Sequence, residues 1–456
     1  MKMVDVVLVN PPILGKKPSI IIPSLGIGYL ASALRQAGIG VRIVDAGLLG
    51  MGIEEVVKEV IRFEPKVVGI TGTTPVIDSG YALAKKLRDK VNWLILGGAH
   101  CSAVRGKVFE ECPELDFGFI GEAEERFLGL VRKLLNGDKD IDIDGVIYPG
   151  RSSEMAKISD LDSLPFPAWD LMRIDRFKHP LFAGLRVATM ITSRGCPYQC
   201  IFCDKSVGGN KYRARSPESV LREIEELRNK YHIQALIFYD DLFTFEPERT
   251  IEICKEIVRR GIKIRWKCEG RVNLVQEESL EWMKRAGCEV IAYGIETAHQ
   301  KGLDWLSKGV KVEEMISAVK LTKQAGIKVL GYFIFGIPVE SYEEELESIE
   351  FAKDLGLDYV QFGSLSPFPG SRLYELAIQN GWYKEARAPA PEEYGERRPL
   401  LITDYWNEQR LERILKKAYK RFYFRPGYIL RTGLRRSGII ELARSGFRLG
   451  RWMRKK

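Results

Sequence analysis

The sequence predicts an α/β protein with a doubly wound N-terminal domain, a partial (β/α)6 barrel of the TIM type, and a helical, basic C-terminal region. Two observations carry this prediction. Short apolar strands alternate with helices through residues 1–140, and a second strand–helix series of six units begins near residue 187. Continuous apolar strands separated by helices are typical of parallel sheets that are covered on both faces.

The composition indicates a large intracellular protein. The chain has 456 residues, of which 45% are hydrophobic, and this is enough for two or three domain cores. The first ten residues have the pattern of a buried strand rather than of a secretory signal, and no apolar run approaches the ~20 residues of a membrane-spanning helix. Eight cysteines, three of them clustered, favour a reducing compartment over a disulfide framework. We therefore expect a cytoplasmic protein.

The first domain is expected at residues 1–140. Its predicted strands are 4–10, 41–45, 67–71, 93–97 and 117–120, and its predicted helices are 25–37, 53–63 and 78–86. Helix 25–37 is closed by Gly38. Strands and helices at these intervals predict a doubly wound, Rossmann-like sheet.

Residues 141–186 are expected to form a linker, because the run Ser163-Leu-Pro-Phe-Pro-Ala-Trp169 is broken by prolines. The barrel is expected at 187–371, with strands 187–192, 235–240, 262–268, 289–294, 329–336 and 359–364. The helices between them are expected at 217–230, 248–260, 276–286, 312–325 and 342–355. Six units are too few for a closed eight-stranded barrel and fit a partial one. Residues 372–456 are predicted to be helical.

Three cysteines, Cys196, Cys200 and Cys203, follow the first barrel strand with C-x3-C-x2-C spacing. A loop of this kind supplies three thiolates, whereas a cubane iron–sulfur cluster has four irons, so one iron remains open for a non-protein ligand. The loop also leaves the carboxyl end of a strand, where α/β barrels build their active sites. The alternative is a zinc loop or buried structural cysteines. A zinc site needs a fourth ligand, and His232 is the next candidate along the chain.

This spacing, with the aromatic Phe202 just before the third cysteine, resembles the radical S-adenosylmethionine (SAM) superfamily. The resemblance implies that Cys196, Cys200 and Cys203 hold a [4Fe-4S] cluster whose open iron binds SAM. Reductive cleavage of SAM then gives a 5′-deoxyadenosyl radical that attacks an unactivated carbon. It also implies a low-potential electron donor such as ferredoxin or flavodoxin.

Polar and glycine-rich loops follow the later barrel strands, and they resemble the radical SAM branch shared with methylthiotransferases and Elongator-type enzymes. By that resemblance, Asp240 or Asp241 holds the amino group of SAM, and Arg271 meets its carboxylate. Glu296 holds the ribose, and the segment from Gly336 to Pro338 lies at the adenine edge. Any single carboxylate in such a loop is about as often a helix N-cap or a solvated side chain.

The N-terminal domain resembles the cobalamin (B12)-binding Rossmann-like module that precedes many radical SAM barrels. The matching segments are Asn10-Pro-Pro12, Pro23-Ser-Leu-Gly-Ile-Gly28, Ile70-Thr-Gly-Thr-Thr74, Gly97-Gly-Ala-His100 and Gly121-Glu-Ala-Glu124. The residues that this resemblance places at cobalamin are Pro23, Gly26, Gly28, Asp45, Gly47, Thr71, Thr73, Thr74, Gly97, Gly98, His100, Gly121 and Glu122.

One motif departs from the family pattern. Many cobalamin carriers have Asp-x-His-x-x-Gly, whose histidine binds cobalt from below, but this chain has Gly47 in the histidine position after Asp45. No lower axial imidazole can come from that motif. His100 is the remaining histidine of the domain, and its default role is support rather than ligation. The departure leaves open a domain that has lost cobalamin.

The net charge of +9 is concentrated at the end of the chain. Residues 420–456 contain twelve Lys or Arg residues and one acidic residue, Glu441, mixed with apolar side chains. This pattern favours a peripheral contact with the inner membrane face, or a lipid-like substrate. A solvated basic helix is an equally good interpretation. Nucleic acid could use the same charge, but we favour it less.

Four functions are weighed. The first is a cobalamin-dependent radical SAM C-methyltransferase that transfers methyl from methylcobalamin to a carbon radical. The second is an oxidative cyclase, or a lipid- or tetrapyrrole-modifying enzyme, with the same cofactors, like the anaerobic magnesium-protoporphyrin monomethyl ester cyclase. The third, a transfer-RNA methylthiotransferase, would need a second cysteine triad, but the N-terminal domain has only Cys101 and Cys112. The fourth is a cobalamin sensor or carrier, which would need no open iron. The small-molecule, lipid or tetrapyrrole substrate is not specified by the sequence.

Overall fold

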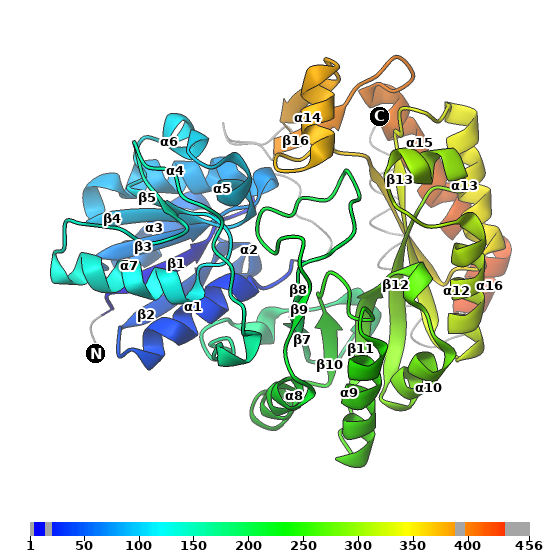
Figure 1. Ribbon diagram of the computed structural model, residues 1–456, viewed down its shortest axis with the longest axis horizontal. Helices are drawn as coiled ribbons and strands as arrows, with labels where there is room; N and C mark the ends of the chain where they lie inside the picture. Colours follow the sequence, from blue (N-terminus) through cyan, green and yellow to red (C-terminus); the bar gives the residue numbers. More distant parts are fainter. Residues whose placement is uncertain (1–3, 14–20, 388–396, 434–456) are drawn as a thin grey trace.

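The computed structural model describes residues 4–13, 21–387 and 397–433. Its two large sheets flank the loop that carries the three cysteines (Figure 1). Most of the predicted basic tail lies outside the described residues. None of the helices within the described ranges has the length and apolar character needed to cross a lipid bilayer.

The N-terminal sheet has the order β2-β1-β3-β4-β5-β6, and its first five strands in chain order are parallel. These strands are β1 (Val6–Asn10), β2 (Val41–Asp45), β3 (Val67–Thr71), β4 (Trp93–Gly97) and β5 (Phe117–Phe119). The doubly wound prediction is confirmed. The strand order reverses between β1 and β3, and open α/β sheets of this kind bind ligands at the carboxyl ends of the strands beside such a switch point.

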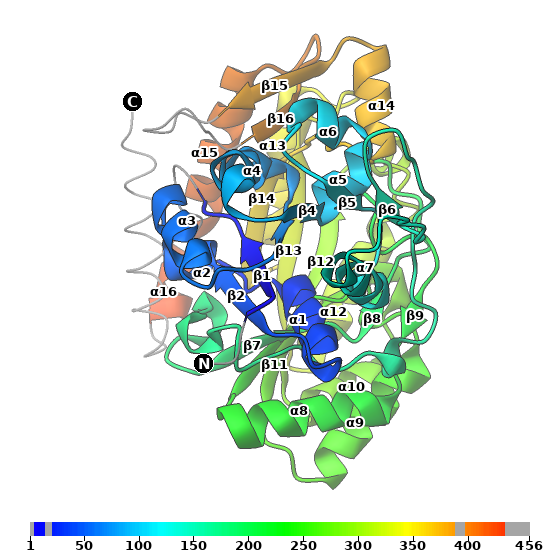
Figure 2. The same ribbon diagram turned by 90° about the vertical axis from the view of Figure 1, so that its left-hand side faces the viewer.

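Side chains alternate along these strands and bury two separate cores. One core packs under α1 (Leu25–Gln36) and α7 (Glu124–Asn136), and the other packs under α3 (Ile53–Ile61) and α4 (Ile77–Leu87). Figure 2 shows α1 and α7 close to each other beside the sheet. The shorter helices of this half are α2 (Ala46–Leu49), α5 (Ala99–Val104) and α6 (Lys107–Glu111).

The second sheet is a six-stranded open barrel with the order β14-β13-β12-β11-β10-β7, and all of its strands are parallel. Its strands are β7 (Val187–Met190), β10 (Ala235–Phe238), β11 (Arg265–Gly270), β12 (Cys288–Glu296), β13 (Lys328–Phe335) and β14 (Tyr359–Ser364). Its helices are α8 (Pro217–Tyr231), α9 (Pro247–Arg259), α10 (Glu277–Arg285), α11 (Gln300–Trp305), α12 (Val312–Gln324) and α13 (Tyr342–Asp354). The six predicted units are all present.

The predicted linker packs against both halves of the chain. Its strand β6 (Val146–Ile147) pairs antiparallel with β5, so part of residues 141–186 completes the N-terminal sheet. Further along, Phe177 and Phe182 pack on Val187, Ala235 and Ile237. The alternate strand residues, such as Ala188 and Leu236, face the core that includes α8. The linker aromatics therefore fill the face of β7 and β10 that α8 leaves uncovered. The domain boundaries proposed at residues 140, 186 and 371 stay predictions.

The C-terminal region is not entirely helical, contrary to the prediction. After α14 (Arg372–Gln379), strands β15 (Tyr383–Arg387) and β16 (Arg397–Leu401) form an antiparallel pair. Five of their ten residues are charged and one is a proline, so their composition carries no clear strand signal. Helices α15 (Glu408–Tyr423) and α16 (Pro426–Gly433) follow.

Helix α15 caps the free edge of the barrel sheet with tyrosine hydroxyls. Among the strands of the described residues, β14 pairs with β13 alone, so its other edge has no partner strand there. The Tyr419 hydroxyl accepts from the Phe362 amide at 3.2 Å and donates to its carbonyl at 3.1 Å. The Tyr423 hydroxyl does the same for Val360, at 3.0 and 2.7 Å. Four residues of helix rise by about 6 Å and two residues of strand by about 6.8 Å, so the i,i+4 tyrosines match the strand. Exposed sheet edges invite aggregation, and this cap removes one.

The double variant Tyr419→Phe/Tyr423→Phe should destabilise the protein. It leaves backbone groups of Val360 and Phe362 buried without partners, and each such group costs about 1–3 kcal/mol. We expect the free energy of unfolding, measured by chemical denaturation, to fall by roughly 2–4 kcal/mol. Tyr405→Phe, at a tyrosine that is 56% exposed, is the control. A double variant as stable as this control would contradict the capping role.

Candidate functional site

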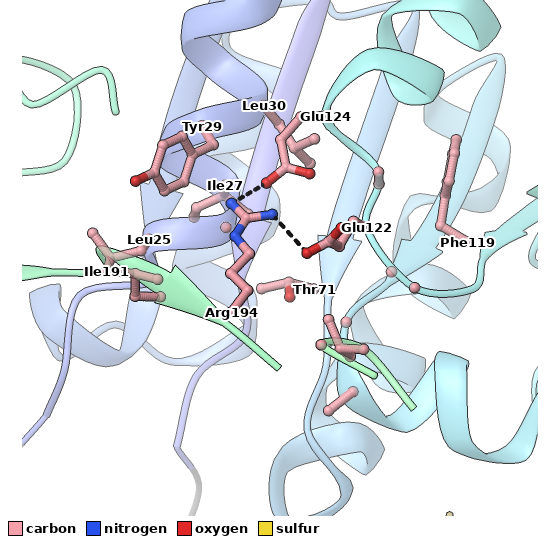
Figure 3. A pocket seen from close by; sticks show the side chains of 18 of the residues that line it. Leu25, Ile27, Tyr29, Leu30, Thr71, Phe119, Glu122, Glu124, Ile191 and Arg194 are labelled. Carbon is pink, nitrogen blue, oxygen red and sulfur yellow. Dashed lines mark hydrogen bonds and ion pairs between the residues drawn. The ribbon is translucent and has the colours of Figure 1, made fainter. Parts of the chain in front are cut away.

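A cavity of about 550 Å³ lies between the N-terminal sheet and the barrel. On one side it reaches the carboxyl ends of β1, β3, β4 and β5 and the facing surfaces of α1 and α7. On the other side it reaches the cysteine loop and the end of β10. Figure 3 shows the part that is lined by α1, α7 and Arg194. Residues from distant parts of the chain therefore share one cavity.

The cysteine loop spans residues 195–212 between the short antiparallel strands β8 (Ser193–Arg194) and β9 (Arg213–Ala214). Gly195 begins the loop with φ of 86°, and a side chain there would meet the Lys211 carbonyl, so only glycine fits. Cys196 and Cys203 line the cavity, and the backbone amide of Cys203 donates to the Cys200 carbonyl at 3.2 Å. The three thiols thus lie on one compact loop that faces the N-terminal domain.

Cys200 lies where a thiolate is favoured. A hydrogen bond from the Cys203 thiol, together with the nearby Lys308 and Arg271 cations, lowers the pKa of Cys200 to about 6, although burial opposes this shift. Arg271 Nη1 is 3.8 Å from Cys200 Sγ, and its guanidinium stacks 3.7 Å from the Tyr198 ring centroid. Thiolates are the form of cysteine that binds metal, so the local charge suits a cluster ligand.

The donor set fits an iron–sulfur cluster better than a single metal ion. In the part of the chain that the structure describes, no three His, Cys, Asp or Glu side chains converge on one metal position. His232 ends α8 just before β10 begins, so it lies at the opposite end of the parallel sheet from the cysteines. It therefore cannot complete a zinc site with them. A cubane distributes its ligands over separate irons, so three cysteines on one loop suit it.

Glu296 and Lys308 form a buried ion pair beside the cysteines. Glu296 Oε1 is 2.6 Å from Lys308 Nζ, and Glu296 has the left-handed φ of 66° where β12 and β13 change register. Strained non-glycine residues of this kind cluster at functional sites. Sequence reasoning missed Lys308, which comes from the loop after α11. A lysine in a polar loop carries no signal of its own, and only the fold brings it to Glu296.

Asp240 and Asp241, predicted as alternatives, have different surroundings. Asp240 accepts from the Thr192 amide at 2.6 Å, the Thr192 hydroxyl at 2.5 Å and the Ser193 hydroxyl at 2.7 Å. It is fully engaged in holding the start of the cysteine loop. Asp241 accepts from the Gly195 amide at 3.0 Å and lines the cavity. Burial raises the pKa of both carboxyls. The structure therefore makes Asp241 the carboxylate that a ligand can reach.

The Gly336–Pro338 segment is held from behind by Glu345 of α13. The buried Glu345 carboxylate accepts from the Gly336 amide at 2.7 Å and from the Ile337 amide at 2.8 Å. Trp406 Nε1 donates to the Ile337 carbonyl at 3.2 Å. The backbone donors of this turn are thus already used. The turn can still present its shape and its remaining carbonyls to a ligand.

The N-terminal part of the cavity is an apolar slot between the sheet and α1 and α7. Its walls include Leu8, Ile27, Ile95, Phe119 and Phe127. Gly97 lines it, and a Cβ at Gly97 would meet no atom within 4 Å, so the absent side chain leaves room for a ligand. A long cofactor appendage fits such a slot.

The rim of the slot carries polar groups. Glu124 Oε2 is buried without a hydrogen-bond partner among the described atoms, and Glu124 lines the cavity. The amide-bearing edge of a corrin supplies N–H donors for an acceptor of this kind. The slot and its rim therefore fit the cobalamin that the sequence resemblance implies.

The predicted cobalamin residues divide into two groups. Those that line the cavity are Gly26, Thr71, Gly97, Gly98, Gly121 and Glu122. Those that do not line it are Pro23, Gly28, Asp45, Gly47, Thr73, Thr74 and His100. Two of the residues that do not line the cavity have structural roles instead. A Cβ at Gly28 would meet Met172 and Pro167 of the linker, and Asp45 accepts from Asn10 Nδ2 at 2.9 Å and caps α2.

His100 does not face the cavity. Its ring is buried, Nδ1 lies 3.0 Å from the Thr74 hydroxyl, and Nε2 lies 3.6 Å from Glu111 Oε2. Thr74 and His100 thus form a buried hydrogen bond with each other away from the cavity. Gly47 contacts Ile13 and Ile21 rather than the cavity. Neither position offers an imidazole to a ligand in the slot.

Comparison with known proteins agrees with this geometry. Residues 12–131 match the B12 binding domain, and residues 190–377 match the radical SAM superfamily. The chain is 33% identical over 458 residues to an uncharacterized methyltransferase of Pyrococcus horikoshii, covering 96% of this chain and 97% of that protein. It is 27% identical over 423 residues to the anaerobic magnesium-protoporphyrin IX monomethyl ester cyclase of Rubrivivax gelatinosus, covering 89% of this chain and 75% of that protein.

The fold is also that of a solved radical SAM methyltransferase. The chain matches TsrM of Kitasatospora setae, whose structure holds cobalamin and a [4Fe-4S] cluster, with a TM-score of 0.73. The match covers 94% of this chain and 90% of that one at 19% identity, so it supports the fold alone. The family is identified by the two domain matches and by the relative of Pyrococcus horikoshii. The chain belongs to the radical SAM superfamily, among the cobalamin-dependent radical SAM methyltransferases and related cyclases that carry a B12-binding domain ahead of the barrel.

Proposed function

We propose that this protein methylates an unactivated carbon of a small molecule by cobalamin-dependent radical SAM chemistry. One observation carries the proposal. The cysteine loop and the apolar slot of the N-terminal domain open into the same cavity of about 550 Å³. A substrate in this cavity would meet both cofactors without leaving the protein.

When bound, a [4Fe-4S] cluster with SAM supplies a radical that abstracts hydrogen, and cobalamin supplies the methyl group. The protein supplies binding and orientation. Cys196, Cys200 and Cys203 would hold the cluster, leaving one iron open. Arg271 would bind the SAM carboxylate and Asp241 its amino group, because both groups face the loop.

The Glu296–Lys308 pair presents a carboxylate and an ammonium for ribose hydroxyls at the same site. The N-terminal domain closes the other side of the cavity and limits the access of water, which would otherwise quench reactive species. Reduction of the cluster needs a low-potential electron donor, for which a ferredoxin or a flavodoxin is suitable.

Oxidative cyclisation is the second candidate, because the cyclase of Rubrivivax gelatinosus is a relative over 89% of this chain. Methylation adds a methyl group to the substrate, whereas oxidation removes hydrogen, so product mass distinguishes the two. The methyltransferase relative covers nearly the whole chain at higher identity, and we therefore favour methylation.

The surface of α16 supports a peripheral membrane contact. Phe424, just after α15, and Ile429 and Leu430 on α16 are each exposed, and Lys420 and Arg421 precede them in the sequence. The residues that follow, 434–456, lie outside the described structure and contain eight basic residues and one acidic residue. Apolar side chains flanked by cations suit an anionic lipid surface.

Cys203→Ala should abolish cluster assembly and SAM cleavage. The variant leaves two thiolates where the cluster needs three. After anaerobic reconstitution we expect iron content to fall to background and no 5′-deoxyadenosine to form, while cobalamin still binds. Cys112→Ala, in the N-terminal domain and outside the cavity, is the control. A wild-type protein with a full cluster that makes no 5′-deoxyadenosine would instead favour the sensor or carrier.

Gly97→Leu should weaken cobalamin binding and leave the structure of the barrel unchanged, because Gly97 lies at the end of β4 in the N-terminal sheet. The new side chain would occupy the slot, and overpacking costs about 1–3 kcal/mol, or roughly 5- to 150-fold in Kd. Titration of the apoprotein with hydroxocobalamin measures this change. Gly106→Leu, also with open space around its Cβ but outside the cavity, is the matched control. Equal affinities for the two variants would argue against the slot.

Leu430→Glu combined with Phe424→Glu should reduce flotation of the full-length protein with vesicles of anionic phospholipid. The substitutions place carboxylates on the apolar surface that would enter the lipid. Ile378→Glu is the control, since Ile378 is 51% exposed on α14, compared with 65% for Leu430. If the double variant floats as well as the wild type, α16 is not the contact, and if wild type does not float, there is no contact to explain.

A further inference from the structure

The hairpin of β8 and β9 joins the two halves of the molecule. It forms the stem of the cysteine loop, since Arg194 lies directly before Gly195 and Arg213 lies just after the loop ends. Side chains alternate along a strand. Ser193 points to the barrel, where it donates to Asp240, whereas Arg194 points to the N-terminal domain. The stem is therefore attached on both sides.

Two arginines of the stem bind two glutamates of the N-terminal domain. Arg194 reaches Glu122 Oε1 at 3.2 Å and Glu124 Oε1 at 2.6 Å, as Figure 3 shows. Arg213 reaches Glu122 Oε2 at 2.6 Å and Oε1 at 3.1 Å. We call these four residues the interdomain network. Glu122 also accepts from the Ile158 amide at 2.6 Å, which ties the linker to the same point.

The network is nearly dry. The side chains of Glu122, Glu124, Arg213 and Arg194 are 1%, 7%, 9% and 14% exposed. Buried ion pairs add little net stability, because desolvation of the charges offsets their attraction, but a charge left buried without its partner is costly. Because an unpaired buried charge is costly, the network permits only one relative position of the two domains while it is formed. If the domains separate, water hydrates all four charges, so the free-energy cost of separation stays moderate.

An apolar contact made by α1 lies next to the ionic network. Leu25 and Tyr29 belong to the same hydrophobic core as Trp169 and Met172 of the linker. Tyr29 also lies under the Arg194 guanidinium, 5.3 Å from its ring centroid. The contact between the N-terminal domain and the rest of the chain therefore combines an apolar part with the ionic network.

The barrel side of the stem is equally constrained. Asp240 holds the Thr192 amide, Asp241 holds the Gly195 amide, and Arg249 Nη2 donates to the Thr192 carbonyl at 3.0 Å. A displacement of the N-terminal domain would therefore pull on the strand that leads into Cys196.

We propose that Glu122 and Glu124, through Arg194 and Arg213, are positioning residues that set the B12-binding domain over the cysteine loop. This rests on the proposed function for its catalytic consequence only. The network itself touches no reacting atom. Its role is to hold the two cofactor sites at the separation that methyl transfer from SAM to cobalamin requires.

The test uses the full-length variant Glu122→Gln/Glu124→Gln, which keeps the side-chain shapes and leaves the cysteine loop unchanged. In the apoprotein, hydrogen exchange should accelerate at least tenfold at residues 119–123 and 156–158, and amides of β11 and β12 should stay protected. In the reconstituted protein without cobalamin, where contacts of Glu122 and Glu124 to cobalamin play no part, SAM cleavage to 5′-deoxyadenosine should stay within threefold of wild type. Methylation of cob(I)alamin by SAM, measured at cobalamin concentrations that saturate the variant so that weaker binding does not contribute, should fall at least thirtyfold.

Arg35→Gln is the matched control, because Arg35 forms an exposed ion pair with Asp170 of the linker at 2.7 Å. It should change neither exchange nor methylation. The proposal is overturned if SAM cleavage and cobalamin methylation fall equally, or if exchange or methylation in the double variant matches the control. If wild type lacks both SAM cleavage and cobalamin binding, the proposed function fails, and hydrogen exchange still decides whether the network holds the domains.

Discussion

Ser193 and Arg194 are neighbours on a two-residue strand, and their side chains bind opposite halves of the molecule. Ser193 donates to Asp240 in the barrel, and Arg194 pairs with Glu122 and Glu124 in the N-terminal domain. The next residue but one is Cys196. The position of the cysteine loop relative to both sheets therefore depends on this hairpin. Because strand side chains alternate in direction, two consecutive residues are enough to make the connection.

Two parallel sheets explain why the cavity exists at all. In each sheet the strands end on the same edge, and the loops beyond that edge carry glycines and polar residues rather than core side chains. The structure turns the two edges toward each other, with the cysteine loop between them (Figure 1). A single cavity then receives ligands from both domains. Methyl transfer needs that arrangement, since a carbon radical must meet its methyl donor before it meets water.

Many polar residues at these edges hold the loops instead of facing the cavity. Asp240 binds Thr192 and Ser193, Glu345 binds the amides of Gly336 and Ile337, and His100 binds Thr74. A buried carboxylate needs donors, and tight loops have unpaired amides, so each satisfies the other. Asp241, which lines the cavity, and Arg271, which lies beside the Cys200 thiol, are therefore the residues that we propose for binding SAM.

The sequence by itself determined the two strand–helix series, the clustering of three cysteines on one loop and the absence of a cobalt-binding histidine after Asp45. These features are local: burial on both faces makes a strand continuously apolar, and three thiolates on one loop need no distant partner. It did not predict the hairpin of β15 and β16, whose charged residues resemble a helix surface. Only the tertiary structure distinguished Asp241, which lines the cavity, from Asp240, which holds Thr192 and Ser193, brought Lys308 to Glu296, and joined Arg194 and Arg213 to Glu122. Those choices depend on which groups meet in space after a separation of as many as 91 residues along the chain, as for Arg213 and Glu122, and the pairing of buried charges leaves no periodic pattern in a sequence.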